Sequence, residues 1–374
     1  MRIMHWTESF HPRIGGMEVF VRHLVAAQRE RGHACEVITS ALPGAPDVER
    51  IDGCAVHRLP FHRALAARSL PMIRSVQEQA AGRLAAFEPD VVHLHTSQAS
   101  AFFLMRISRG RPMPIVYTAH DGFLAPLHSV PTSLLGSVLA GANRVVAPSD
   151  FVARALAASF PDSRGALVRI HGSLPAPAEP KQCAPHDVAA APTVARLVAL
   201  GRLTRDKGFD TLLDALARIG PDTPAWRAEI AGDGPEATRL RALIAHFGLE
   251  SRVRLCGWTA PDVVPTWLGS AAMLVVPSRW QEPFGLVALQ AMQCGIPVIA
   301  SRVGGLPEIV AEGVSGLLVE PDDPPALAAA IDRLLRDADA RGRMGMAAKA
   351  RAESAFAWED LVVAYETIYE DLRH

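Results

Sequence analysis

Cysteine is scarce in this sequence of 374 residues, and no two cysteines form a C-x-x-C pair. The five scattered residues are Cys35, Cys54, Cys183, Cys256 and Cys294. An odd number at irregular spacing argues against a disulfide framework and against a zinc site, and it favours a reducing cytosol. The formal net charge is only −1. The chain therefore lacks the basic character that nucleic-acid binding requires, and we expect no nucleic-acid partner.

Long hydrophobic runs are missing as well. The first ten residues, MRIMHWTESF, do not contain the apolar core of a signal peptide. Residues 122–143 contain no Asp, Glu, Lys or Arg, but prolines and polar residues interrupt them, so they do not predict a membrane span. These absences predict a cytoplasmic protein. Arginines among apolar residues between positions 63 and 83 leave two interpretations open: a solvated helix face, or peripheral association with the inner face of a membrane.

Apolar runs alternate with segments of helical periodicity along most of the chain. The runs predict strands at 2–6, 35–39, 55–58, 91–95, 115–118 and 144–147, and again at 195–200, 226–231, 253–255, 273–276, 298–300 and 317–319. Segment 17–31 has the helical pattern, with Gly32 as its end. Strands that alternate with helices form parallel sheets, so the sequence predicts an α/β fold with doubly wound sheets.

One stretch breaks this alternation. Residues 173–193 contain five prolines, many alanines and no apolar periodicity, which is typical of a linker. The linker separates two predicted Rossmann-like domains of similar size, at 1–172 and 194–357. The last segment, 358–374, is predicted to be helical. Its periodicity predicts one buried face, but it does not identify the domain against which that face packs.

In the second domain, a predicted strand is followed by a loop and a helix that could bind an anion. Glu282 is followed closely by Phe284 and Gly285, which allow a helix to begin abruptly at Leu286. Gln290 lies eight residues after Glu282, a little over two helical turns, so both side chains can face one ligand. The N-terminus of a helix binds anions, most often phosphate. The loop therefore predicts a site for a sugar nucleotide.

A second loop, 201–208, has the sequence GRLTRDKG and connects another predicted strand to an apolar helix. Arg202 can bind two oxygens of a diphosphate at once, whereas Lys207 acts as a point charge. The alternative interpretation is an exposed basic turn. The third cation, Arg205, is expected to be solvated.

Weaker candidates lie at other strand ends. Gly15 and Gly16 lie between the first strand and the first helix, but their loop is not the G-x-G-x-x-G of dinucleotide-binding proteins. His120 follows a first-domain strand, while Gly232 and Trp258 follow two strands of the second domain. For each of these residues, a purely structural role competes with a functional one.

Together, Glu282-x7-Gln290 and the G-R-L-x-x-x-K-G element at 201–208 resemble the signature of glycosyltransferase family 4. These are retaining sugar-nucleotide transferases with the GT-B fold. The resemblance implies two facing Rossmann-like domains with a deep cleft, and a C-terminal helix that crosses back onto the first domain. It also implies that Arg202 and Lys207 hold the donor pyrophosphate, that Glu282 binds hydroxyls of the donor sugar, and that residue 290 binds the ribose.

By the same resemblance, the catalytic residues are His120, Arg202, Lys207 and Glu282, and the donor-binding residues also include Gly15, Gly16, Gly232, Trp258, Phe284, Gly285 and Leu286. The implied activity is transfer of a hexosyl unit from a UDP- or GDP-linked sugar to a hydroxyl of a glycan, lipid-linked or small-molecule acceptor. The implied mechanism is front-face attack, in which the leaving phosphate takes the acceptor proton and no cofactor is needed. The D-x-D motif at 337–339 lies among helix-forming residues, so we predict no required metal.

Two departures from the family pattern keep alternatives open. Gln290 stands where the family has Glu, and His171-Gly172-Ser173 stands where it often has Asn-Gly. A Gln can still bind a ribose, about 1 kcal/mol more weakly than a charged Glu. The alternatives are a catalytically silent sugar-nucleotide-binding relative and a GT-B sugar-nucleotide 2-epimerase, which would need no acceptor.

Overall fold

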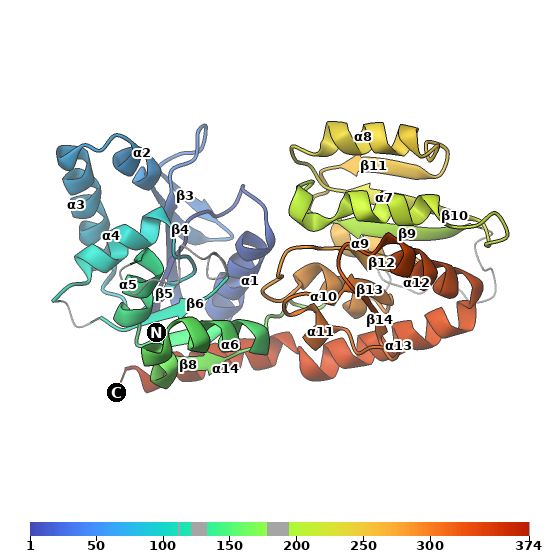
Figure 1. The fold of residues 1–374 in the computed structure, drawn as a ribbon. Helices are drawn as coiled ribbons and strands as arrows, with labels where there is room; N and C mark the ends of the chain where they lie inside the picture. The colour runs from blue at the N-terminus through green and yellow to red at the C-terminus, as the bar shows by residue number, and fades with distance from the viewer. Residues whose placement is uncertain (111–112, 121–132, 178–193, 374) are drawn as a thin grey trace. The chain divides into compact units, whose positions relative to one another are not determined.

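The computed structural model describes residues 1–110, 113–120, 133–177 and 194–373, and Figure 1 shows the order of its helices and strands. The chain divides into two compact units, Met1–Gly172 with Glu359–His374, and Ser173–Trp358. Most of the predicted linker, at 178–193, lies outside the described residues. Each unit contains one parallel or mostly parallel sheet with its own hydrophobic core.

The first unit is built on eight strands in the order β3-β4-β2-β1-β5-β6-β7-β8. The strands are β1 Arg2–Trp6, β2 Ala34–Ser40, β3 Val48–Ile51, β4 Cys54–Leu59, β5 Val91–Leu94, β6 Ile115–Thr118, β7 Arg144–Ala147 and β8 Leu167–Arg169. All neighbours pair in parallel except β3 and β4. Strands β2, β4 and β3 extend the sheet on one side of β1, and strands β6, β7 and β8 extend it on the far side of β5. The switch point lies between these two strands.

Two of these strands, β3 and β8, are absent from the sequence prediction. The edge strand β3, with the sequence VERI, alternates exposed with half-buried residues. Strand β8 has three residues, none of them fully buried. Short strands at a sheet edge bury little apolar surface, so they leave no clear hydrophobic pattern in the sequence. The antiparallel strand β3 adds one edge strand to the predicted doubly wound parallel sheet.

Helices cover both faces of this sheet. They are α1 Gly16–Glu30, α2 Phe61–Ala66, α3 Leu70–Phe87, α4 Ala99–Ile107, α5 Leu134–Gly141, α6 Asp150–Ser159 and α14 Trp358–Asp371. Helices α2 to α6 pack with Met4 and Trp6 of β1 in one core cluster. The residue between them, His5, has its side chain on the other face, where it contacts Gln28 of α1.

The C-terminal helix α14 completes the core on that other face. Its buried residues are Leu361, Val362, Tyr365, Ile368 and Tyr369. The Tyr365 hydroxyl lies 2.9 Å from Oγ1 of Thr118 on β6, and the Tyr369 hydroxyl lies 2.6 Å from Nδ1 of His93 on β5. Buried hydrogen bonds therefore join the end of the chain to strands near its beginning.

The second unit has six parallel strands in the order β11-β10-β9-β12-β13-β14. They are β9 Ala195–Leu200, β10 Trp226–Ala231, β11 Val253–Gly257, β12 Met273–Val276, β13 Val298–Ser301 and β14 Gly316–Val319. Counted from β9, this is the 3-2-1-4-5-6 order of a doubly wound Rossmann-type sheet. Its switch point lies between β9 and β12.

Helices cover this sheet on both faces as well. They are α7 Phe209–Ala217, α8 Ala237–His246, α9 Val264–Gly269, α10 Leu286–Gln293, α11 Leu306–Ile309, α12 Pro324–Arg336 and α13 Ala338–Ala355. Met273 and Val275 of β12 pack toward α7, α8 and α12, whereas Leu274 packs toward α9, α10 and α11. Burial on both faces explains why these strands are continuous apolar runs in the sequence. No described helix has the length and hydropathy needed to span a membrane.

Candidate functional site

The switch point of the second unit brings two predicted loops together. Loop 201–208 follows β9 and loop 277–285 follows β12, and these strands are neighbours. Doubly wound folds bind ligands in the crevice at such a point. Lys207 Nζ donates to Oε1 of Glu282 at 2.5 Å, and Ser278 Oγ donates to the same oxygen at 2.8 Å. The Lys207 and Glu282 side chains are 22 % and 14 % exposed, so both remain accessible to a ligand.

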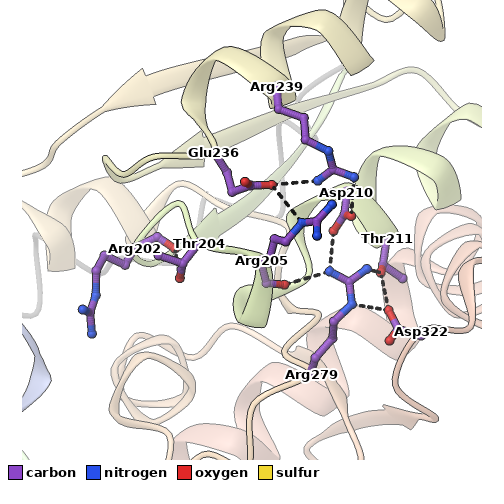
Figure 2. A network of polar contacts seen from close by, with 9 residues as sticks. All are labelled: Arg202, Thr204, Arg205, Asp210, Thr211, Glu236, Arg239, Arg279 and Asp322. Atoms are coloured by element: carbon purple, nitrogen blue, oxygen red, sulfur yellow. Dashed lines mark hydrogen bonds and ion pairs between the residues drawn. The ribbon is translucent and has the colours of Figure 1, made fainter.

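Arg279, which the sequence analysis did not single out, joins the two loops, as Figure 2 shows. Its Nη1 donates to the Arg205 carbonyl and to Oδ1 of Asp210, both at 2.7 Å. Its Nη2 donates to Oγ1 of Thr211 at 2.8 Å, and its Nε donates to Asp322. Burial raises the pKa of Asp210, but hydrogen bonds from Arg279 and a second arginine outweigh burial and leave that pKa below its usual value.

The backbone strengthens this connection. The N–H groups of Arg279 and Trp280 donate to the Asp206 carbonyl at 2.8 and 3.0 Å. The short turn η4, Arg205–Lys207, is thereby held against the loop that carries Glu282. In the sequence, the available signal is an arginine that closely follows a buried strand and comes three residues before Glu282. Its partners lie between 43 and 74 residues away along the chain, so the sequence alone does not identify them.

The two arginines of loop 201–208 differ from Arg279. The Arg202 side chain is exposed and points away from the Arg279 contacts (Figure 2). Among the described residues it makes no side-chain hydrogen bond or ion pair, so its guanidinium is available to an anion. The Arg205 side chain is 76 % exposed, with Glu236 at 3.9 Å. The prediction that Arg205 is solvated agrees with this exposure.

Close backbone contacts explain two glycines near these loops. A Cβ on Gly232, after β10, would lie 1.8 Å from the Gly201 carbonyl oxygen. A Cβ on Gly304, after β13, would lie 2.2 Å from the Glu282 carbonyl oxygen. Both glycines also have positive φ angles, +141° and +57°, which side chains other than glycine rarely adopt. Gly232 thus has a structural reason to be glycine that is independent of any nucleotide contact.

The helix after Glu282 begins at the predicted residue, but the count of helical turns from Glu282 to Gln290 does not apply. Helix α10 begins at Leu286 with Gly285 as its N-cap, so Glu282 lies in the preceding loop. The argument from helical spacing between Glu282 and Gln290 is therefore wrong. Gln290 is half-buried within α10, and its side chain makes no hydrogen bond to any described residue. Leu286 is half-buried at the start of the helix.

Two aromatic residues of the predicted donor site lie in different environments. Phe284 is only 4 % exposed, and its ring meets the ring of Phe356 edge-on at 5.5 Å. Its side chain belongs to the core, so any ligand contact would come from its backbone, and its place in the donor site stays a prediction. Trp258, which follows β11, is 58 % exposed. Its indole is therefore accessible.

The predicted residues of the first unit lie at the ends of its central strands. Gly15 is the N-cap of α1 and Gly16 is its first residue. His120 follows β6, and its Nε2 lies 3.3 Å from Nδ1 of His95. Its ring lies 5.1 Å from the Phe20 ring. Burial lowers the pKa of His120 to about 3, so the ring is neutral at physiological pH.

The arginine-containing segment between 63 and 83 forms parts of α2 and α3. Its arginines are exposed, while Met72, Ile73 and Val76 pack toward the core. Leu70 is the exception, since 68 % of it is exposed. This arrangement is typical of a solvated helix face, and membrane association stays a prediction.

Comparison with known proteins adds evidence of a different kind. Residues 14–172 match the family model described as Glycosyltransferase Family 4, and residues 186–351 match the model described as Glycosyl transferases group 1. The chain is 33 % identical over 396 residues to D-inositol 3-phosphate glycosyltransferase of Geodermatophilus obscurus, covering 96 % of this chain and 86 % of the relative. The chain belongs to glycosyltransferase family 4.

Other relatives of this glycosyltransferase agree with that assignment. N-acetyl-alpha-D-glucosaminyl L-malate synthase of Bacillus anthracis is 26 % identical over 97 % of this chain and 95 % of its own. Among solved structures, sucrose-phosphate synthase from Thermosynechococcus elongatus has a TM-score of 0.83 at 24 % identity, covering 100 % of this chain and 99 % of its own. Anabaena HepE, in complex with UDP and glucose, has a TM-score of 0.77 at 25 % identity and the same coverage. The predicted family and its α/β GT-B fold class are confirmed.

One cluster of residues of metal-ligand type lies in the core of the first unit of this glycosyltransferase. His5, His93 and His95 are fully buried, and their ligand atoms lie within 4.8 Å of one another. The D-x-D motif at 337–339 has a structural role instead, because Asp337 is the N-cap of α13 and its Oδ1 accepts from the Ala340 N–H at 2.8 Å. The motif therefore belongs to a helix start.

Proposed function

We propose that this glycosyltransferase transfers a hexosyl unit, with retention of configuration, from a UDP- or GDP-linked sugar to a hydroxyl of its acceptor. The observation that supports this most directly is the Lys207–Glu282 pair at the switch point of the second unit, with Lys207 in the same loop as Arg202, whose side chain has no partner among the described residues. The relative HepE was solved in complex with UDP-glucose, which favours UDP. The acceptor is a glycan, a lipid-linked molecule or a small molecule. The names of the inositol-phosphate and malate enzymes favour the small molecule.

In this mechanism, the bond between the anomeric carbon and the phosphate oxygen breaks, and a bond to the acceptor oxygen forms on the same face. The leaving phosphate takes the acceptor proton. Arg202 and Lys207 would stabilise the negative charge that grows on this phosphate as the bond stretches. Each such preorganised contact is typically worth ~10²–10³ in rate. These cations supply the charge that a divalent metal supplies in other transferases, so we propose that no metal is required.

The Lys207–Glu282 pair suits two separate roles, binding of the diphosphate by Lys207 and binding of the donor sugar by Glu282. An ammonium group has three donors. Lys207 gives one of them to Glu282. The contacts of Glu282 from Lys207 and Ser278 both engage Oε1. Its Oε2 could therefore accept from a hydroxyl of the donor sugar, while the remaining donors of Lys207 reach the diphosphate. The ion pair would then keep both groups charged and correctly placed before the donor arrives.

The first test is a thermal-shift panel with UDP, GDP, TDP and ADP on the wild type, Arg202→Ala and Arg205→Ala. Arg205 is the matched control, because it lies in the same loop but is mostly solvated. A ligand at 100 times its Kd should add about 2.7 kcal/mol of stability. We expect one nucleotide to stand out, and its shift to be lost in Arg202→Ala but kept in Arg205→Ala. Equal losses in both variants would contradict the diphosphate role of Arg202.

Product analysis separates the proposal from its two alternatives. With the stabilising nucleotide sugar and a hydroxyl acceptor, we expect a glycoside of the same anomeric configuration as the donor, formed also in the presence of EDTA. A new sugar nucleotide formed without acceptor would identify a 2-epimerase. Nucleotide binding without turnover of any acceptor tested would favour the silent relative, for which Gln290 is the structural argument.

A further inference from the structure

Four histidines form a cluster between the sheet of the first unit and the helices α1 and α14. His5 lies on β1 opposite His93 of β5, His95 follows β5, and His120 follows β6. His5, His93 and His95 are 0 % exposed. Burial lowers the pKa of His5 to about 4 and lowers the pKa values of His93 and His95 well below the usual value, so these rings are neutral in the folded protein. Each neutral ring has one N–H and one lone pair, and therefore two tautomers.

Three of these rings form a continuous hydrogen-bonded chain that begins at Gln28. His5 Nε2 lies 2.8 Å from Oε1 of Gln28, and His5 Nδ1 lies 3.0 Å from Nε2 of His95. His95 Nδ1 then lies 3.3 Å from Nε2 of His120. In such a chain each contact needs one donor and one acceptor. The tautomer of any one ring therefore determines the tautomers of the other two.

The surroundings of Gln28 determine the direction of this chain. Its amide nitrogen donates to the Tyr369 hydroxyl at 3.2 Å, and the Cys35 thiol lies 4.0 Å from its Oε1. The Tyr369 hydroxyl lies 2.6 Å from Nδ1 of His93, a short distance that suits a phenol O–H donating to an imidazole nitrogen. Tyr369 thus needs a donor for its own oxygen, and the Gln28 amide N–H is that donor. This orientation turns Oε1 toward His5, which must carry its proton on Nε2.

We propose that Gln28, acting through His5 and His95, fixes His120 as the Nε2–H tautomer and leaves its Nδ1 as a permanent hydrogen-bond acceptor. Within the described residues, Nδ1 of His120 makes no hydrogen bond. Gln28, His5 and His95 are positioning residues in this scheme. A bare imidazole nitrogen can accept from a hydroxyl, but it repels the oxygens of a phosphate. The fixed tautomer of His120 therefore favours a sugar hydroxyl over a phosphate as its hydrogen-bond partner. This assignment of the ligand rests on the proposed function.

The tautomer itself is measured without any substrate. In the full-length protein labelled with ¹⁵N-histidine, long-range ¹H–¹⁵N spectra at pH 7.5 distinguish a protonated ring nitrogen from a bare one. We expect protonated Nε2 and bare Nδ1 at His5, His95 and His120. A proton on Nδ1 of His120 would overturn the proposal. So would a shift of the His5, His93 and His95 signals on adding one equivalent of Zn²⁺ that EDTA reverses, because it would assign the cluster to a metal.

Two variants of one residue test the relay. Gln28→Met removes the acceptor, whereas Gln28→Glu keeps an oxygen that can accept from His5. We expect mixed tautomers at His120 in Gln28→Met and the wild-type tautomer in Gln28→Glu. Turnover with the nucleotide sugar should fall about twofold or more in Gln28→Met, because only the competent fraction binds the sugar. Affinity for the nucleoside diphosphate alone should not change, and Gln28→Glu should retain turnover.

These measurements separate failure of the relay from failure of the proposed function. If the wild-type tautomers are as stated but no nucleotide stabilises the protein, the proposed function fails and the tautomer relay stands. If nucleotides bind and Gln28→Met leaves the His120 tautomer unchanged, the relay fails and the proposed function stands.

Discussion

Mild acid should destabilise the first unit selectively, because its core contains uncharged histidines. A histidine in an unfolded chain has a pKa of about 6.5. In the native protein, burial lowers the pKa of His5 to about 4 and lowers those of His93 and His95 well below the usual value. Burial likewise lowers the pKa of His120 to about 3. Between about pH 6.5 and pH 4 the unfolded state thus binds four protons, one for each histidine of the cluster, that the native state does not. The stability is present above pH 6.5 and is lost as the pH falls.

The expected loss is large. Each bound proton contributes about 1.4 kcal/mol per pH unit, so four histidines give a slope of about 5.5 kcal/mol per pH unit below pH 6.5. Most of the uptake between pH 7.5 and 5.5 occurs below pH 6.5, so the free energy of unfolding should fall by about 5.5 kcal/mol, a substantial part of the 5–15 kcal/mol typical of a domain. The estimate depends only on the native rings remaining neutral at pH 5.5. Carboxylates contribute little in this range, because they titrate near pH 4.

Hydrogen exchange read by mass spectrometry can measure the two units separately. Peptides from β1 and β5 report the first unit, and peptides from β9 and β12 provide an internal control. In the described part of the second unit, His246 is the only histidine, and it is exposed. After correction for intrinsic exchange rates, we expect the acid-induced loss in the first unit only. His5→Asn should reduce that loss by about a quarter. An equal loss in both units, or none in the first, would refute the reasoning.

Three further substitutions test the second unit. Arg279→Lys keeps the charge but removes the forked contacts that hold the loop of Lys207. Titration calorimetry should therefore show nucleoside diphosphate binding weakened by about tenfold, a loss near 1.4 kcal/mol. Unchanged affinity would show that the contacts of Arg279 do not position this loop for binding. Gln290→Glu should tighten the same binding by about fivefold through a charged hydrogen bond, and no tightening would remove the ribose role of position 290. Gly304→Ala would place a Cβ against the Glu282 carbonyl, so urea unfolding should show the second unit destabilised by about 1–3 kcal/mol.

The apolar pattern of the sequence was sufficient to predict the sheets. Strands β9, β10 and β12 have the predicted bounds, because a strand buried on both faces must be apolar throughout. The loops with Arg202, Lys207 and Glu282 could also be located from the sequence, since they follow such strands directly. In contrast, β3 and β8 bury too little surface to leave a pattern.

Tertiary structure alone decided which residues meet. Lys207 and Glu282 are 75 residues apart, and only the adjacency of β9 and β12 makes them a pair. Arg279 resembles any surface arginine until its partners from three other segments surround it. Amphipathic periodicity showed that α14 buries one face, but a pattern of apolar residues contains no information about the surface that receives it. The histidine cluster is the clearest case, because its hydrogen-bonded chain joins β1, β5 and β6 to a glutamine on α1. Periodicity reports the environment of one segment, whereas the polarity of a hydrogen bond depends on partners that only the fold brings together.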